Sequence, residues 1–218
     1  MTPLIHERVT TLKTLVFDAD GVVIVPPHQF MTHYKEEMGL EPDSLSEFFG
    51  GVFQECLVGR ADLKEAVVPF LPRWGWSGTV EDFLRRWFEE EHHINKPLIE
   101  VVGKLRQEGY RCVVATNQER HRLSYMCEQM GFSRLFDGVF GSVDVGAVKP
   151  TYEFYERVTK LLDVETEEIV FWDDTERNVD GARAYGWYAE LFTDMDELYR
   201  TLELHVGVTR EEICLSCG

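Results

Sequence analysis

The sequence has few basic residues and no long apolar run. Its 218 residues include 22 Lys and Arg against 39 Asp and Glu, which gives a net charge of −17. This acidic excess argues against broad electrostatic binding to nucleic acid or to an anionic membrane surface. No apolar stretch approaches the roughly 20 residues that a membrane-spanning helix needs. A small anionic substrate is still acceptable, provided that its site supplies a local cation.

Cysteine is scarce as well. Five cysteines are present, an odd number, and Cys56, Cys112 and Cys127 lie in apolar or helical stretches. We therefore expect reduced thiols and, because the N-terminus has no apolar signal segment, a cytoplasmic protein. Cys214 and Cys217 form a Cys-x-x-Cys pair, but the sequence has no second pair at the spacing of a zinc site. We interpret this pair as an incidental part of the tail.

Strand and helix patterns alternate over most of the chain. An apolar, β-branched run predicts a buried strand over residues 12–18, and Pro26-Pro27 marks a boundary after it. The later pattern predicts strands at 111–115, 138–141, 168–172 and 187–192, with helices at 97–108, 119–130, 152–162, 177–185 and 196–206. This alternation predicts an α/β fold with a Rossmann-like, doubly wound parallel sheet as its core.

Helical patterns alone fill the segment between the first two predicted strands. The expected helices are residues 28–38, 43–56, 60–72 and 79–93, and the acidic run Glu89-Glu90-Glu91 is expected to face solvent. A segment this long is not an ordinary connection, so we expect a small all-helical cap subdomain. The predicted domains are a catalytic core of residues 1–26 and 96–218 and a helical cap of residues 27–95.

Polar residues follow the predicted strands where each strand ends. Because the carboxyl ends of parallel strands meet at one edge of a sheet, these side chains are expected to share a pocket. Four carboxylates at close range cannot all stay ionised without a cation, and oxygen ligands suit Mg²⁺. A Thr-Asn pair offers a hydroxyl and backbone N–H groups to a phosphate, and a lysine offers a point charge. The residues are Asp18, Asp20, Thr116, Asn117, Lys149, Asp173 and Asp174.

The ordered set Asp-x-Asp-Gly-Val, Thr-Asn, Lys-Pro and Asp-Asp-x-x-x-Asn resembles the four motifs of the haloacid dehalogenase superfamily of phosphohydrolases. The helical insertion after the first motif resembles that superfamily's cap. The resemblance implies that Asp18 is a nucleophile that forms an aspartyl-phosphate. It also implies that Asp20 protonates the leaving oxygen and then deprotonates the attacking water.

The resemblance further implies a metal site and a phosphate site. Mg²⁺ would be held by the Asp18 carboxylate, the Asp20 carbonyl and the Asp173-Asp174 pair. Many relatives have Gly-Asp at this pair, which favours Asp174 as the direct ligand and leaves Asp173 to act through water or through its charge. The expected phosphate-binding residues are Thr116, Asn117 and Lys149, and the expected position of Asn178 is behind the metal site.

These features predict a Mg²⁺-dependent phosphatase that hydrolyses a small phosphorylated metabolite of the sugar phosphate or nucleotide type. A phosphomutase of the same fold would keep every motif and is the main alternative. A 2-haloacid dehalogenase is less expected, because that branch generally lacks the acid at Asp20. A non-catalytic scaffold would need neither Asp18 nor Asp20. The sequence leaves the substrate's identity and the oligomeric state open.

Overall fold

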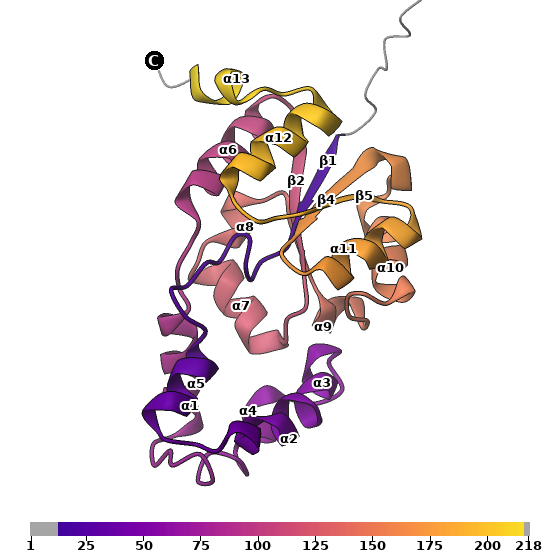
Figure 1. The fold of residues 1–218 in the computed structure, drawn as a ribbon. Helices are drawn as coiled ribbons and strands as arrows, with labels where there is room; N and C mark the ends of the chain where they lie inside the picture. Colours follow the sequence, from indigo (N-terminus) through magenta and orange to yellow (C-terminus); the bar gives the residue numbers. More distant parts are fainter. Residues whose placement is uncertain (1–12, 216–218) are drawn as a thin grey trace, which may run out of the picture.

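A single parallel sheet forms the centre of the fold (Figure 1). The computed structural model describes residues 13–215, without the side chains of residues 42, 214 and 215, so the Cys214–Cys217 prediction lies outside the described side chains. In the described chain the sheet has five strands in the order β3-β2-β1-β4-β5, and every pair is parallel. The strands are β1 (Thr14–Phe17), β2 (Arg111–Thr116), β3 (Gly138–Gly141), β4 (Ile169–Asp173) and β5 (Tyr188–Leu191). The predicted α/β class and parallel sheet are confirmed.

Helices cover both faces of this sheet (Figure 1). They are α6 (Lys96–Gln107), α7 (Arg120–Glu128), α8 (Phe132–Leu135), α9 (Ser142–Val145), α10 (Tyr152–Leu162), η2 (Thr166–Glu168), α11 (Glu176–Tyr185), α12 (Met195–Val206) and α13 (Arg210–Leu215). The short helices α8, α9, η2 and α13 are additions to the predicted set. No helix of the described chain combines the length and apolarity needed to cross a bilayer.

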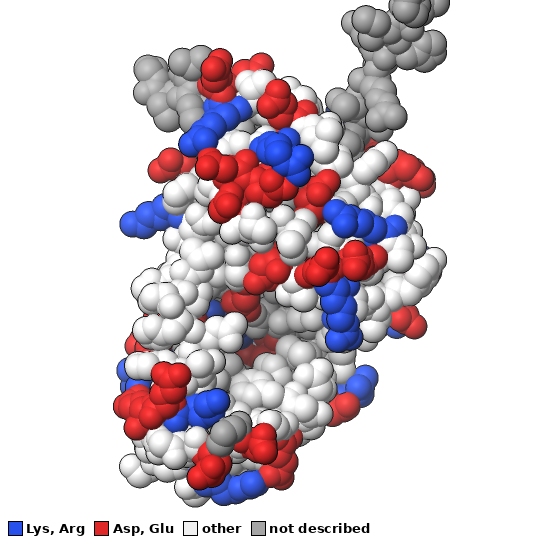
Figure 2. Space-filling view, viewed as in Figure 1, with Lys and Arg blue, Asp and Glu red and all other residues white. Residues whose placement is uncertain are grey.

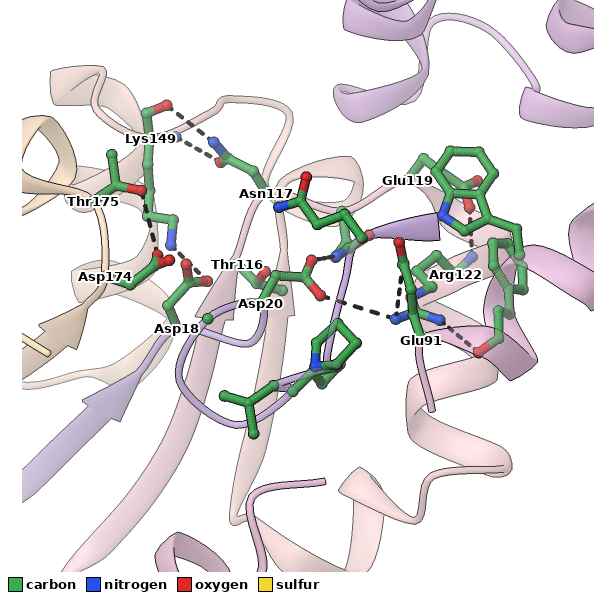
Figure 3. A pocket seen from close by; sticks show the side chains of 18 of the residues that line it. Asp18, Asp20, Glu91, Thr116, Asn117, Glu119, Arg122, Lys149, Asp174 and Thr175 are labelled. Carbon is green, nitrogen blue, oxygen red and sulfur yellow. Dashed lines mark hydrogen bonds and ion pairs between the residues drawn. The ribbon is translucent and has the colours of Figure 1, made fainter. Parts of the chain in front are cut away.

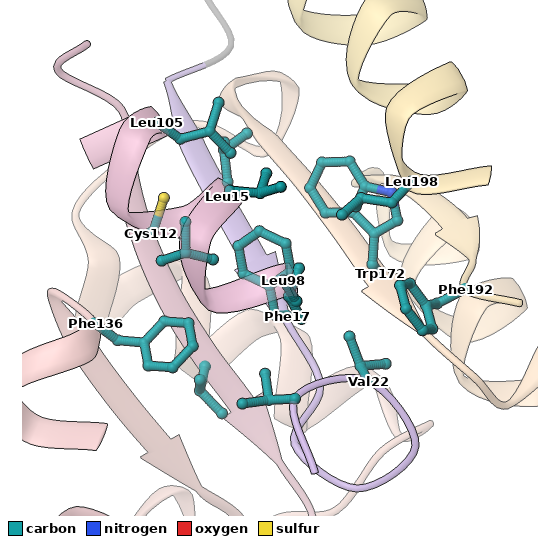
Figure 4. Packing of buried hydrophobic residues seen from close by; sticks show 14 of the residues in the cluster. Leu15, Phe17, Val22, Leu98, Leu105, Cys112, Phe136, Trp172, Phe192 and Leu198 are labelled. Carbon is teal, nitrogen blue, oxygen red and sulfur yellow. The ribbon is translucent and has the colours of Figure 1, made fainter. Parts of the chain in front are cut away.

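Alternate residues of each strand supply the two cores. Leu15 and Phe17 point to the side of α6 and α12, where the Phe17 and Trp172 rings stack at 5.2 Å between centroids (Figure 4). Val16 and Phe171 point to the opposite side, against α10 and α11. Each large side chain buried in this way contributes roughly 1.5–3 kcal/mol. Burial on both faces holds the carboxyl ends of the strands in a fixed array.

The segment between β1 and α6 has helices and no strand, as predicted, and we call its helical part the cap. It contains α1 (Phe30–Glu37), η1 (Pro42–Leu45), α2 (Ser46–Phe49), α3 (Val52–Leu57), α4 (Leu63–Val67) and α5 (Val80–Glu90). The cap has an apolar core of its own, in which the Tyr34 hydroxyl donates to the Trp74 carbonyl at 3.0 Å. The boundaries at residues 27 and 95 stay a prediction.

Three predicted elements are wrong in their extent. The helix predicted over residues 60–72 is limited to α4, because Asp62 caps its start and Pro69 has no N–H to continue it. The first strand ends at Phe17, because the backbone turns at the acidic residues that follow. The single helix predicted over residues 43–56 is broken into η1, α2 and α3. The break falls at Gly51, whose ψ of −113° is not helical. A Cβ at Gly51 would lie 2.5 Å from the Glu47 carbonyl oxygen, so this backbone path requires glycine.

The packing of α12 against the sheet yields a stability prediction. Leu198 is fully buried beside Trp172, whereas Leu204 on the same helix is 64% exposed. Leu198→Ala should lower the free energy of unfolding by about 2–5 kcal/mol, because it removes buried methyl groups and leaves a cavity. Leu204→Ala, the matched control, should change it by less than about 0.5 kcal/mol. Urea unfolding measures both, and equal effects would contradict this packing.

Candidate active site

The chain turns sharply where β1 ends. The Asp18 N–H donates to the Trp172 carbonyl at 2.8 Å and so continues the ladder with β4. The Ala19 carbonyl then accepts the N–H of Ile24 at 2.8 Å, which closes the turn. Gly21 lies in this turn with a φ of +85°, a conformation that favours glycine. The turn places the two acids of the first motif at the carboxyl edge of the sheet.

Gly21 also leaves room for an acid from another strand. A Cβ at this position would lie 2.0 Å from Oδ2 of Asp174, which follows β4. The Asp174 carboxylate therefore packs over the turn of the first motif, on the same side as Asp18 (Figure 3). Only glycine allows this approach.

Lys149 lies between two buried carboxylates. Its Nζ is 2.7 Å from Oδ1 of Asp18 and 2.6 Å from Oδ2 of Asp173. Burial opposes a charge on Lys149, but the two carboxylates outweigh burial and raise the pKa of the amine above its usual range. The ammonium group is thus fixed at the centre of the site.

Asp18 has one occupied and one free oxygen. Oδ1 accepts the Ala19 N–H at 2.7 Å as well as the lysine contact. Within residues 13–215, no hydrogen bond or ion pair reaches Oδ2. Burial raises the pKa of Asp18 to about 7, against the lowering effect of Lys149, and a neighbouring cation would lower it again. The free oxygen is available to attack a substrate or to bind a metal.

Asp18, Asp173 and Asp174 form the one acidic group in the described chain that is arranged to hold a metal ion. Each offers an oxygen within 4.8 Å of the others. Asp173 is fully buried, and its oxygens accept bonds from Lys149, from the Asn178 amide at 3.0 and 3.1 Å and from the Thr175 N–H. Asp174 is exposed to the cavity. This geometry favours Asp174 over Asp173 as a direct ligand and places Asn178 behind the metal site.

The second motif supports the lysine and faces the cavity. The Asn117 side chain donates to the Lys149 carbonyl at 3.0 Å and accepts the Lys149 N–H at 2.8 Å. The Asn117 side chain thus fixes the backbone of Lys149, and the Asn117 backbone faces the cavity beside it. Thr116 lines the cavity, and no hydrogen bond in the described chain involves its hydroxyl. That hydroxyl is free for a phosphate oxygen.

The Asp20 carboxylate lies apart from the metal cluster. Gln118 donates to its Oδ2, and Nη2 of Arg122 lies 3.9 Å from its Oδ1 (Figure 3). Burial raises the pKa of Asp20, although Arg122 opposes the shift. Two carboxylates of the first motif thus have different surroundings, one beside lysine and one beside arginine and glutamine. Such a difference suits two different catalytic roles.

Arg122 connects the core to the cap. Its side chain is 5% exposed, and it donates through Nη1 to the Phe88 carbonyl at 3.1 Å. Its Nη2 lies 3.4 Å from Oε2 of Glu91, and Glu91 also accepts the Phe30 N–H at 2.9 Å. Arg122 and Glu91 thus form an ion pair between core and cap, at the end of the site away from Asp18.

The site opens into a cavity of about 550 Å³ between the sheet edge and the cap. Figure 2 shows this hollow, with charged side chains at its bottom and mostly uncharged surface on the cap side. All seven site residues predicted from the sequence are found here. Six of them, all except the fully buried Asp173, line the cavity.

Residues 12–186 match the family model of the haloacid dehalogenase-like hydrolases. The chain belongs to this family. The resemblance of the four motifs is therefore confirmed over most of the chain.

The chain is similar in sequence to two curated proteins and in fold to a solved structure. Bifunctional epoxide hydrolase 2 of Sus scrofa is 27% identical over 90% of this chain and 39% of its own length, so the hydrolase spans about two fifths of that relative. Pyrophosphatase PpaX of Bacillus mycoides is 23% identical over 80% of each chain. A family enzyme of Bacteroides thetaiotaomicron, solved with magnesium and inorganic phosphate, is 20% identical, covers 87% of this chain and all of its own, and superimposes with a TM-score of 0.70.

Sequence reasoning missed the charges that close the far end of the hydrolase's site. The expectation of a solvent-facing acidic run is wrong for Glu91, which is only partly exposed and pairs with Arg122. Gln118 and Arg122 carry no motif of their own. Both residues follow the Thr-Asn pair closely in the sequence. Because residues after a strand end face the ligand site, this position could have indicated that they line the cavity.

The close approach at Gly21 predicts a metal-binding defect. Gly21→Ala should push the Asp174 carboxylate away from Asp18 and weaken Mg²⁺ binding by the hydrolase about tenfold or more. Gly39→Ala is the matched control, because Gly39 has a φ of +62° but no atom within 4 Å of the added Cβ. Isothermal titration calorimetry with Mg²⁺ compares the two variants. Equal affinities would show that Asp174 takes no part in metal binding.

Proposed function

We propose that this hydrolase is a Mg²⁺-dependent phosphatase that cleaves a small phosphate monoester through an aspartyl-phosphate on Asp18. The observation that carries the proposal is the free Oδ2 of Asp18, a carboxylate oxygen held beside the Lys149 ammonium and close to the Asp174 carboxylate. The relative solved with magnesium and inorganic phosphate supports the same chemistry.

In the first step, Oδ2 of Asp18 attacks phosphorus, and the bond between phosphorus and the alcohol oxygen breaks. Asp20 gives its proton to the departing alcohol; its raised pKa suits this role. Gln118 and Arg122 orient the Asp20 carboxyl group toward the cavity. Lys149 neutralises Asp18 and, with the Thr116 hydroxyl, binds the phosphoryl oxygens.

In the second step, Asp20 removes a proton from a water molecule that attacks the phosphorus of the aspartyl-phosphate. The bond between phosphorus and Oδ2 breaks, inorganic phosphate leaves, and Asp18 is restored as a carboxylate. The cap limits access of other water to the intermediate. Asp20 therefore serves as acid and then as base in one cycle.

The acids at the sheet edge fit a divalent cation. Mg²⁺ would be held by the Asp18 carboxylate, the Asp174 carboxylate and the Asp20 carbonyl, which receives no backbone hydrogen bond in the described chain. When bound, it would neutralise the charge of the phosphoryl oxygens and keep Asp18 ionised. Asp173 would keep Lys149 in place rather than bind the ion directly.

The proposal predicts that Asp18→Asn abolishes phosphate release from p-nitrophenyl phosphate in the presence of Mg²⁺. The loss should be about 10³-fold or more, because an amide cannot form the covalent intermediate. Asp180→Asn is the matched control, since Asp180 is 68% exposed on α11 and lies outside the cavity.

Phosphate release within tenfold of the parent by Asp18→Asn would overturn the assignment of the nucleophile. A product assay with glucose 1-phosphate separates the phosphomutase alternative. Glucose 6-phosphate in place of inorganic phosphate would establish transfer to a sugar rather than to water.

A further inference from the structure

The cavity has two chemically different parts. The sheet edge supplies the charged and polar groups described above. The cap supplies an apolar wall made of Phe49, Phe53, Leu63, Trp87 and Phe88, and Val25, which precedes the cap, lines the cavity as well. A cavity of about 550 Å³ lies within the range of about 300–1,000 Å³ that accommodates small organic ligands. There is thus room beside the phosphate site for more than a phosphate group.

Three aromatic rings form the centre of this wall. The Phe49 and Phe53 rings lie 5.0 Å apart, and the Trp87 ring is 6.1 and 6.3 Å from them. Phe49 and Phe53 are only partly buried, whereas the residues that fill the cap interior, such as Phe83, are fully buried. The two phenylalanines therefore present apolar surface to the cavity beyond what the cap needs for its own packing.

The carboxylates near this wall have partners within the protein, whereas Nη2 of Arg122 is buried without a hydrogen bond. Glu91 accepts the Phe30 N–H and lies 3.4 Å from Arg122. Glu119 accepts the N–H groups of His121 and Arg122 at the start of α7. Of the described cavity-lining side chains on the cap side, Gln29 is the polar one without a hydrogen bond. A sugar or a nucleobase bound against this wall would leave most of its polar atoms without hydrogen-bond partners, which would lower its binding affinity.

The charges at the far end also disfavour a second phosphate. Asp20, Glu91 and Glu119 contribute carboxylates there, against one cation among the described residues, Arg122, whose Nη2 lies 3.9 Å from Asp20 and 3.4 Å from Glu91. A nucleoside diphosphate would bring further negative charge to a region where three carboxylates already outnumber one arginine.

We infer that the substrate is the phosphate monoester of an apolar alcohol, whose hydrocarbon part lies against the aromatic wall of the cap while its phosphate lies at Asp18. This inference rests on the phosphatase function proposed above and adds the chemical class of the leaving group. Burial of the hydrocarbon would replace water at Phe49, Phe53 and Trp87, so affinity should grow with apolar length.

A series of n-alkyl phosphates from ethyl to octyl tests this inference with the parent protein and Mg²⁺. The value of kcat/KM should rise by about fourfold for each methylene until the wall is covered. Octyl phosphate should exceed glucose 6-phosphate and AMP by at least tenfold. Equal values along the series, or a preference for glucose 6-phosphate or AMP, would overturn the inference while leaving the phosphatase intact.

Failure to hydrolyse any ester, p-nitrophenyl phosphate included, would overturn the phosphatase function and this inference with it. The two failures are therefore distinguishable.

Variants of the wall provide a second test. Phe53→Gln should lower the ratio of kcat/KM for octyl phosphate to that for ethyl phosphate by at least tenfold, whereas Phe53→Leu should largely keep it. Val68→Gln is the control, because Val68 is a cap residue that is 49% exposed and lies outside the cavity. Thermal unfolding checks that each variant is folded. An unchanged ratio in folded Phe53→Gln would overturn the inference.

Discussion

The buried contact of Lys149 with Asp18 and Asp173 is the interaction on which the site depends. Two buried carboxylates repel each other, and the ammonium group of Lys149 between them compensates both charges. The surrounding hydrogen bonds serve this arrangement. The Asn117 amide fixes the backbone of Lys149, and Asn178 and the Thr175 N–H hold Asp173. The lysine is thereby presented to Asp18 in one position, and one oxygen of Asp18 stays free for chemistry.

The fold makes this contact possible by joining four distant stretches of sequence. Parallel pairing of β1 with β2 and β4 places the ends of these strands side by side, and packed helices on both faces prevent them from sliding. The cap, inserted between β1 and β2, then encloses the edge that carries the charges. An acidic protein can thus bind an anion, because its attraction is local to the site rather than spread over the surface.

Local patterns were sufficient to predict the sheet, the helical insertion and the acids, threonine, asparagine and lysine at the strand ends. Each of these depends on short-range features: alternation of strand and helix, turn residues after an apolar run, and short motifs in a fixed order. The break at Gly51 escaped prediction because it depends on the close approach of the Glu47 carbonyl. The ion pair of Glu91 with Arg122 could not be predicted, because the two residues meet only when the cap packs on the core. The aromatic wall escaped it for the same reason, since Trp87 also resembles an ordinary core residue of the cap.

The most direct measurement of the central claim is the detection of phosphate on Asp18. Asp20→Asn should slow attack by water and allow the aspartyl-phosphate to accumulate, because the variant has no base at this position. Acid quenching during turnover of p-nitrophenyl phosphate with Mg²⁺, followed by peptide mass spectrometry, should find one phosphoryl group on the peptide that contains Asp18. A quenched protein with no phosphopeptide while p-nitrophenol is released in a burst, or with the phosphoryl group on another residue, would contradict the account.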